Sequence, residues 1–417
     1  MINLYTSKSQ CCGCTACMSV CPERAITMKP DENGFLYPVI DSSLCIECKL
    51  CKKVCSFQYD VENPCTLSKP LKTYAAILKD TDFLKNSASG GAFVALAMYT
   101  LHNNGVVFGC TMNDGLKPEH ICIDSFNDIH KLQGSKYVQS DLKDTYYEIK
   151  KYLKSNRLVL FTGTPCQVAG LKSYLGKEYD NLITADLICH GVPSYSFFKS
   201  YIQWIEWKLE GKIIDFRFRI KEKCWGHGAK VVYKKNGIVK EKSIVPIESC
   251  YYYYFLKGYI YRESCYECPY AGPYRIGDFT FGDYWGIDKV HPEVNRSNGV
   301  SLVLVNTQKG LQIINGVDPF NIFDGSRKYK NSFKINDCLY LIESDFEKAR
   351  QYNGQLNYPV IRHKEREIIL NIFREEGFKA VADKYYNDMK KQIIMYKIKA
   401  IIPTPIKSKI KKILKRT

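Results

Sequence analysis

Cys11-Cys12-Gly13-Cys14-Thr15-Ala16-Cys17-Met18-Ser19-Val20-Cys21-Pro22 stands near the start of the chain, and Cys45-Ile46-Glu47-Cys48-Lys49-Leu50-Cys51-Lys52-Lys53-Val54-Cys55 follows it. Both stretches have the spacing C-x2-C-x2-C-x3-C, and each cysteine of the second lies 34 residues after its counterpart. Eight cysteines in two matched runs are typical of iron–sulfur clusters, whereas zinc ribbons use cysteine pairs. Cys12 falls between the regularly spaced positions and is left over.

The repeat resembles the two-cluster bacterial ferredoxin, in which the remote fourth cysteine of each run ligates the other cluster. The resemblance therefore implies one [4Fe–4S] cluster held by Cys11, Cys14, Cys17 and Cys55. It implies a second [4Fe–4S] cluster held by Cys45, Cys48, Cys51 and Cys21.

Length and composition indicate a globular protein of two or three domains. The chain has 417 residues, of which 45% are hydrophobic and 25% charged, values that are ordinary for a globular chain. The first 20 residues lack the apolar segment of a secretory signal, and no apolar run is long enough to span a bilayer. The chain has 19 cysteines, and we therefore expect a cytoplasmic protein in which they are reduced, and most of them cluster-bound, rather than paired in disulfides.

The formal net charge of +17 does not indicate nucleic-acid binding, because it is concentrated at one end. Ten Lys or Arg and no acid lie between Met389 and Thr417. In residues 401–417, isoleucines recur at helical spacing among lysines, which predicts peripheral contact with the inner face of a membrane. A solvated, disordered tail is the alternative. The mildly basic remainder suits the docking of an acidic ferredoxin-type electron carrier.

The pattern of elements predicts a multidomain α+β and α/β fold. A ferredoxin-type domain over 1–60, with short strands at 25–27 and 35–39, precedes a linker at 61–72. Alternating apolar strands and helices over 73–335 predict an α/β domain, with a β-hairpin insertion that turns at Asn236-Gly237. Residues 336–400 are expected to form a helical appendage, and 401–417 the basic amphipathic tail.

Three loops of the α/β region have compositions that suit an anionic ligand. Ser89-Gly90-Gly91 precedes an apolar helix, and Gly163-Thr164 follows a buried strand, so backbone N–H groups at both places can face a phosphate. Ser135-Lys136-Tyr137 offers a cation and an aromatic ring. A simple turn, a solvated lysine and a half-buried tyrosine are the alternatives. No G-x-G-x-x-G follows a strand, which argues against a Rossmann NAD site.

Four further cysteines are candidate ligands of a third cluster. Cys166 and Cys189 each lie just past a strand, and Cys265 and Cys268 have ligand spacing. From the residues alone, buried free thiols are the alternative, since that is a common environment of cysteine. His190, beside Cys189, is the candidate catalytic acid, with His227 as a rival and a purely structural histidine as the alternative.

Residues 73–305 resemble the coenzyme F420 hydrogenase/dehydrogenase beta-subunit family. The resemblance is carried by Ser89–Gly91, Gly134–Ser140, Gly163–Gln167, Cys189–Pro193, Cys265-x-x-Cys268 and Gly282–Gly286. It implies bound FAD, contacted by the three loops named above, and a third [4Fe–4S] cluster held by Cys166, Cys189, Cys265 and Cys268. Cys65, Cys110, Cys122, Cys224, Cys250 and Cys338 are expected to be structural.

These patterns together predict an iron–sulfur flavoprotein oxidoreductase. Electrons are expected to move between a ferredoxin-type carrier or redox partner subunit and a small organic substrate or F420-like cofactor, through the clusters and FAD. Two alternatives remain, namely a non-catalytic electron-transfer subunit of a larger complex and an iron–sulfur module that binds no flavin.

Overall fold

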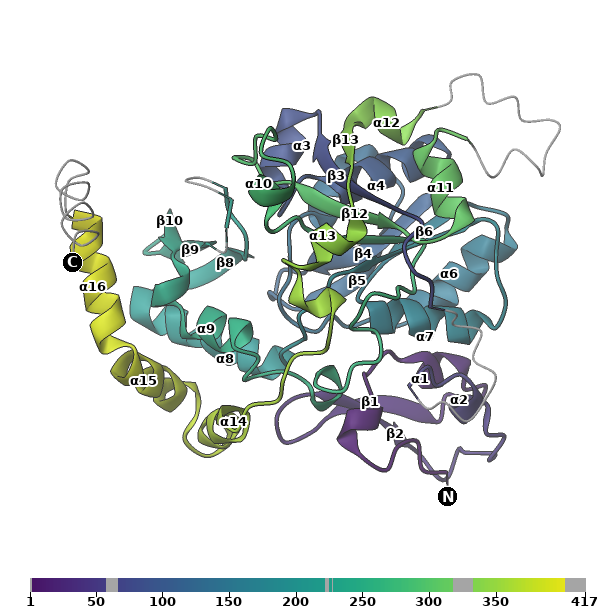
Figure 1. The fold of residues 1–417 in the computed structure, drawn as a ribbon. Coiled ribbons are helices and arrows are strands. Elements are labelled where there is room, and N and C mark those ends of the chain that lie inside the picture. The colour runs from purple at the N-terminus through teal and green to yellow at the C-terminus, as the bar shows by residue number, and fades with distance from the viewer. Residues whose placement is uncertain (1, 58–66, 222–224, 227, 318–332, 402–417) are drawn as a thin grey trace.

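The computed structural model describes residues 2–57, 67–221, 225–226, 228–317 and 333–401. The first segment is a small module at the edge of the molecule (Figure 1). Its two short strands, β1 (Ile26–Pro30) and β2 (Leu36–Ile40), pair antiparallel, as predicted, around the turn that ends at Gly34. Helices α1 (Ala16–Val20) and α2 (Leu50–Lys53) follow corresponding cysteines of the two runs.

An eight-stranded mixed sheet forms the centre of the larger part of the protein, in the order β13-β3-β12-β11-β7-β6-β4-β5. β4, β6, β7 and β11 are parallel to one another, and the strands on either side of them pair antiparallel. The strands are β3 (Lys72–Leu78), β4 (Val106–Met112), β5 (Pro118–Ile123), β6 (Val159–Thr162), β7 (Leu182–Leu187), β11 (Phe279–Asp283), β12 (Ser301–Val305) and β13 (Leu339–Glu343).

Helices cover both faces of this sheet, as expected for strands that are apolar on both sides. On one face, α4 (Ala92–His102) packs with α3 (Thr81–Asn86), α5 (Ile129–Leu132), α11 (Gln308–Ile314) and α12 (Ile335–Cys338). On the other face lie α6 (Thr145–Lys154) and α7 (Pro165–Leu175). Ala16 and Val54 of the small module join this second core, so the module is packed onto the helices.

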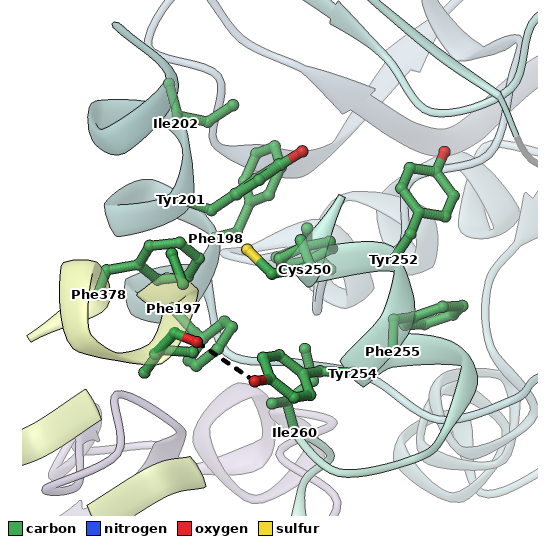
Figure 2. Close-up of a cluster of buried hydrophobic side chains, with 14 of the residues drawn as sticks. Phe197, Phe198, Tyr201, Ile202, Cys250, Tyr252, Tyr254, Phe255, Ile260 and Phe378 are labelled. Carbon is green, nitrogen blue, oxygen red and sulfur yellow. Dashed lines mark hydrogen bonds between the residues drawn. The ribbon is translucent and has the colours of Figure 1, made fainter. Parts of the chain in front are cut away.

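A second layer of structure stands beside the sheet. β8 (Lys212–Arg217), β9 (Ala229–Lys235) and β10 (Ile238–Ile244) form an antiparallel sheet, and the predicted hairpin across Asn236-Gly237 is confirmed. Figure 2 shows the aromatic core that α8 (Tyr195–Leu209), α9 (Cys250–Leu256) and α15 (Phe378–Asp388) share. In it, the Tyr254 hydroxyl donates to the Val381 carbonyl at 3.2 Å.

The predicted helical appendage begins too early. Leu339–Glu343 is strand β13, which pairs with β3 at the edge of the central sheet and is therefore part of the α/β region. The short alternation of buried and exposed residues along β13 is too brief to reveal a strand before its partner is known. The remaining short helices are α10 (Ile287–Val290) and α13 (Phe346–Arg350).

The C-terminal helices run along the side of the molecule away from β3 and α4 (Figure 1). They are α14 (Glu365–Glu376), α15 and α16 (Lys390–Ile401). Almost all of the predicted basic tail, residues 402–417, lies outside the described residues, so membrane contact stays a prediction. Within the described part, no helix combines the length and the apolar character needed to cross a bilayer.

A buried ion pair joins the central strands. Arg275 donates to Asp186 at 2.7 Å, and both side chains are almost fully inaccessible to solvent. The second carboxylate oxygen of Asp186 accepts from the backbone N–H groups of Ile276 and Gly277. Removing one partner of such a pair leaves an uncompensated buried charge.

We therefore expect Asp186→Asn to lower the free energy of unfolding by about 3–5 kcal/mol. The matched control is Asp383→Asn, which breaks the exposed i,i+4 pair with Lys379 and should cost well under about 1 kcal/mol. Urea unfolding of anaerobic protein, followed by tryptophan fluorescence, measures both. Equal losses in the two variants would contradict the importance of the buried pair.

Candidate functional site

The eight cysteines of the repeat gather around two cavities in the small module. One is lined by Cys11, Cys14, Cys17 and Cys55. The other is lined by Cys21, Cys45, Cys48 and Cys51. Cys12 and Cys51 also line the first cavity. The four cysteines of each crossed set that the ferredoxin resemblance implies thus line one cavity together.

The electrostatics of these thiols reflect the same grouping. Burial raises the pKa of Cys17, and the neighbouring Cys14, Cys11 and Cys55 sulfurs raise it further. Burial likewise raises the pKa of Cys51, with smaller contributions from Cys48 and Cys21. Thiols that raise one another's pKa lie close together, and ferric and ferrous ions relieve such repulsion when they replace the protons.

A third cavity lies where the module meets the sheet. Cys166 stands in the first turn of α7, directly after β6, and Cys189 follows β7. The two strands are parallel neighbours, so their carboxyl ends open at the same edge of the sheet. Cys265 and Cys268 come from the loop before β11 and line the same cavity. The structure therefore brings together the four cysteines proposed for a third cluster; we name this space the inner cavity.

Burial makes these thiols difficult to ionise without a metal. It raises the pKa of Cys189 and that of Cys268 to about 12, and raises that of Cys265 well above its usual range. Cys166 differs, because hydrogen bonding with Cys12 lowers its pKa to about 7. These cysteines suit a metal centre, because a bound metal cation stabilises the thiolate anions that burial otherwise disfavours.

The sulfurs of the candidate cluster sites are not arranged around a single ion. Among the described residues, no three His, Cys, Asp or Glu side chains converge closely enough to hold one metal ion. A four-cysteine zinc site needs all its sulfurs at about 2.3 Å from one point. A cubane needs four thiolates spread around a larger body, and each of the three cavities is lined by the four cysteines expected for one cluster.

Cys12, which had no predicted role, lies between two of these sites. It is buried and lines both the inner cavity and the Cys11 cavity. Hydrogen bonds with Cys14 and Cys166, followed by burial, raise the pKa of the Cys12 thiol well above normal. The Cys12 thiol thus connects one candidate ligand of the module with one of the inner cavity.

The packing at this seam is close. A Cβ atom at Gly170 of α7 would lie 2.8 Å from the Sγ atom of Cys14. The Cys12 carbonyl accepts from the Gln139 side chain at 3.0 Å, and Tyr270 donates to the Ser56 carbonyl at 2.7 Å. The module is therefore held against the inner cavity by direct contacts and by hydrogen bonds.

His190 lines the inner cavity beside Cys189. Tyr261 donates its hydroxyl proton to the Phe255 carbonyl, and the same hydroxyl oxygen meets Nδ1 of His190. Because the Tyr261 proton is used in this way, Nδ1 of His190 carries the proton and donates to the Tyr261 oxygen. In a neutral ring, Nε2 is then unprotonated and can accept a hydrogen bond. Burial lowers the pKa of His190, so the neutral form prevails near pH 7.

Residues of the loops predicted to contact FAD also stabilise the fold, through packing, hydrogen bonding and helix capping. A Cβ at Gly90 would lie 2.1 Å from the Ala76 carbonyl oxygen, so packing alone requires glycine there. Ser89 donates to the Val300 carbonyl at 2.8 Å. Thr164 and Gln167 form a capping box at the start of α7, and Thr164 lines the inner cavity with Cys166.

Cations nevertheless converge on the loops 84–91 and 133–137. Lys221 donates to the carbonyls of Leu84 and Ser89, and burial lowers its pKa to about 8. Lys136 donates to the carbonyls of Leu132 and Gln133, and burial also lowers its pKa to about 8. Within the described part of the chain, neither ammonium forms an ion pair with a carboxylate.

An arginine and several aromatic rings complete this region. Arg219 donates to Asp283 at 2.7 Å and to the Tyr137 hydroxyl at 3.1 Å. Trp225 and Trp285 stack with ring centroids 4.8 Å apart, and Trp225 donates to Asp283. The buried Nε of Arg219 finds no hydrogen-bond partner among the described residues. An orphaned donor beside unpaired ammonium groups fits an anionic ligand.

Aromatic contacts link this region with the inner cavity. The Tyr137 ring stacks on Phe255 with centroids 4.5 Å apart. Phe255 in turn lies 5.7 Å from the His190 ring and 5.4 Å from Tyr261. The Phe255 ring thus lies between Tyr137 of one predicted flavin loop and His190 of the inner cavity.

The other predicted cysteines and histidine divide into two groups. Cys110, Cys122, Cys250 and Cys338 are free thiols that line none of the three cavities. Cys65, Cys224 and His227 lie outside the described residues.

Most of the α/β region matches the models of one protein family. Residues 73–145 match the N-terminal model, and residues 156–320 the C-terminal model, of the coenzyme F420 hydrogenase/dehydrogenase beta-subunit family. The chain belongs to this family. Residues 10–59 match the 4Fe-4S dicluster domain, so this family member carries that domain ahead of its beta-subunit region.

Two proteins from the genus Methanosarcina are similar to parts of this chain. The F subunit of the F(420)H(2) dehydrogenase from Methanosarcina mazei is 27% identical over 168 residues. That match covers 38% of this chain, and the chain spans about half the length of the relative, 46%. A chain of the F420-reducing [NiFe] hydrogenase complex from Methanosarcina barkeri is 18% identical, with a TM-score of 0.41, over 79% of this family member and 94% of that chain.

Several residues of the site had no signal in the sequence. Arg219, Lys221, Arg262 and Cys12 enter it through contacts with loops distant in the chain. Lysines and arginines are abundant here, 60 in all, so none of them stands out before the fold is known.

We expect Gly170→Ala to weaken the docking of the module, because the added methyl group would overlap the Cys14 sulfur. Overpacking of this kind costs about 1–3 kcal/mol. The control is Gly354→Ala, where a Cβ would meet no atom within 4 Å. Thermal unfolding of anaerobic protein measures both variants, and a melting temperature unchanged in Gly170→Ala would contradict a rigid contact.

Proposed function

We propose that this protein is an iron–sulfur flavoprotein oxidoreductase that moves electrons between a ferredoxin-type carrier or partner subunit and an organic substrate or F420-like cofactor. The observation that carries the proposal is that each of three cavities is lined by the four cysteines expected for one cluster. The inner cavity is also linked to the cation-rich loops through the His190, Phe255 and Tyr137 rings. When bound, clusters transfer single electrons and a flavin exchanges one-electron for two-electron chemistry.

The exposure and contacts of these residues suggest the order in which electrons pass the proposed cluster sites. Cys48 is exposed, and Leu44 and Ile46 beside it leave 51% and 61% of their surface open, so a carrier can approach that cavity. The Cys11 cavity adjoins the inner cavity through Cys12. His190 is the proposed proton-handling residue, because Tyr261 occupies Nδ1 and Nε2 is left to exchange a proton with substrate.

Iron content tests the third cluster. Anaerobic protein should carry about twelve irons, and Cys166→Ala and Cys268→Ala should each remove about four. Both changes should have the same effect because the two cysteines are ligands of one site. Cys250→Ala is the matched control: Cys250 is fully buried and lines none of the three cavities, so its loss should leave the iron count unchanged.

A count near eight in wild-type protein, unchanged in both variants, would contradict the third cluster. Equal iron loss in Cys250→Ala would indicate general instability instead of a specific site.

FAD binding is proposed at the loops 84–91 and 133–137. Lys136, Lys221 and Arg219 supply positive charge for a pyrophosphate, and Tyr137 and the stacked tryptophans supply aromatic faces. Charge-assisted hydrogen bonds of this kind contribute about 1.5–3 kcal/mol each.

Lys136→Met and Lys221→Met should therefore each weaken FAD binding by roughly tenfold or more, with the iron count unchanged. Lys309→Met is the matched control, because Lys309 also donates to two backbone carbonyls, those of Tyr179 and Leu182, but at the start of β7 and away from both loops. Flavin fluorescence of released cofactor measures occupancy. Wild-type protein that binds no flavin would favour the flavin-free iron–sulfur module, and flavin binding without turnover of any small substrate would favour a relay subunit.

A further inference from the structure

A fully buried arginine lies at the seam between the module and the inner cavity. Arg262 has no solvent exposure, and it lines the inner cavity three residues before Cys265. Its Nε donates to the Cys11 carbonyl at 2.7 Å, and a terminal nitrogen lies 3.7 Å from the Cys11 sulfur. One side chain from the α/β region thus hydrogen-bonds the first cysteine of the repeat.

Neighbours hold the guanidinium of Arg262 in one orientation. The second terminal nitrogen donates to the Gln139 side chain at 3.2 Å. The guanidinium carbon lies 4.0 Å from the centre of the Tyr37 ring, on the side of the module. A Cβ at Gly13 would come within 3.0 Å of the same guanidinium, so the module closes directly over it.

The charge of Arg262 has no carboxylate to balance it. In the ranges that the structure describes, Arg262 takes part in no ion pair with Asp or Glu, whereas the buried Arg275 and Arg366 both do. A buried unpaired cation is costly unless a negative group faces it. The Cys11 sulfur lies 3.7 Å from a terminal nitrogen of Arg262, and the Tyr37 ring lies over the guanidinium.

The other cavity of the module is lined by Lys49, which is exposed, and by no arginine among the described residues. Cys45 is the counterpart of Cys11 in the repeat, and among the described residues no arginine donates to it. The two module sites therefore differ in the cation beside them, a buried arginine at the Cys11 site and an exposed lysine at the Cys45 site, although their cysteine patterns match.

We propose that Arg262 stabilises the reduced form of the cluster held by Cys11, Cys14, Cys17 and Cys55, and so makes this cluster the electron acceptor within the module. The proposal rests on the cluster sites of the proposed function. Hydrogen bonds to sulfur and nearby positive charge both raise the reduction potential of an iron–sulfur cluster. In the step that Arg262 favours, one electron leaves the Cys45 site, which is oxidised, and reaches the Cys11 site, which is reduced. No proton moves, and a one-electron carrier restores the electron.

The test is a redox titration of the full-length anaerobic protein, followed by electron paramagnetic resonance. Arg262→Gln should make reduction of the cluster at the Cys11 site at least tenfold less favourable. Its midpoint potential should therefore fall by at least about 59 mV for a one-electron step, while the midpoint potentials of the other clusters stay unchanged. Arg262→Lys keeps the charge and should shift the midpoint less.

Arg366→Gln is the matched control. Arg366 is also buried and also reaches the loop before Cys265, but its partners are the Tyr261 carbonyl and Glu263. The cluster midpoint potentials of the Arg366→Gln variant should equal those of the wild-type protein. Unchanged midpoints in Arg262→Gln with full iron content, or an equal shift in Arg366→Gln, would overturn the proposal.

Gln139→Leu provides a second route if Arg262→Gln does not fold. It releases the guanidinium from its partner without removing the charge, so a smaller shift in the same direction is expected, and no shift would overturn the proposal. Iron and sulfide are counted in every sample. Wild-type protein without clusters would contradict the proposed function, whereas full clusters with unmoved potentials would contradict only the role of Arg262.

Discussion

The contact between Cys14 and Gly170 fixes how the cysteine repeat meets the rest of the protein. Only a residue without a side chain allows the sulfur of the module so close to the backbone of α7. Because Cys166 lies one turn earlier on the same helix, this contact also sets the separation of two candidate cluster sites. Cys12 then occupies the space between them. Electron transfer between separate centres needs this kind of fixed, close placement.

Buried positive charge is the second constraint. Arg275 is neutralised by Asp186 and stabilises the fold, whereas Arg262, Lys136 and Lys221 form no carboxylate pair in the described regions. Burying unpaired cations would be unfavourable in a protein that binds nothing. They lie beside cysteine sulfurs and beside helix-start loops, where we propose clusters and FAD, and this difference separates the structural cations from those to which we assign a function.

The local parts of the fold follow from the sequence. The buried strand β6 is a short, mostly apolar run, and the hairpin is marked by Asn236-Gly237. Helix α7 starts at Pro165, a residue that a helix accepts in its first turn. Edge strands are less visible: β13 is half exposed and is identified only by its pairing with β3. Its five residues carry too little periodic signal to compete with a helical reading.

The sequence by itself determined the cysteine repeat, the crossed grouping that its resemblance implies, and the family. Spacing along the chain suffices there, because the ligands of each run are a few residues apart. Only the tertiary structure decided that Cys12 bridges two cavities, that Arg262 hydrogen-bonds Cys11 across 251 positions, and that Lys221 reaches Ser89. Contacts between distant segments depend on how the module, sheet and loops pack, and a single lysine or arginine carries no local pattern that reveals its partner.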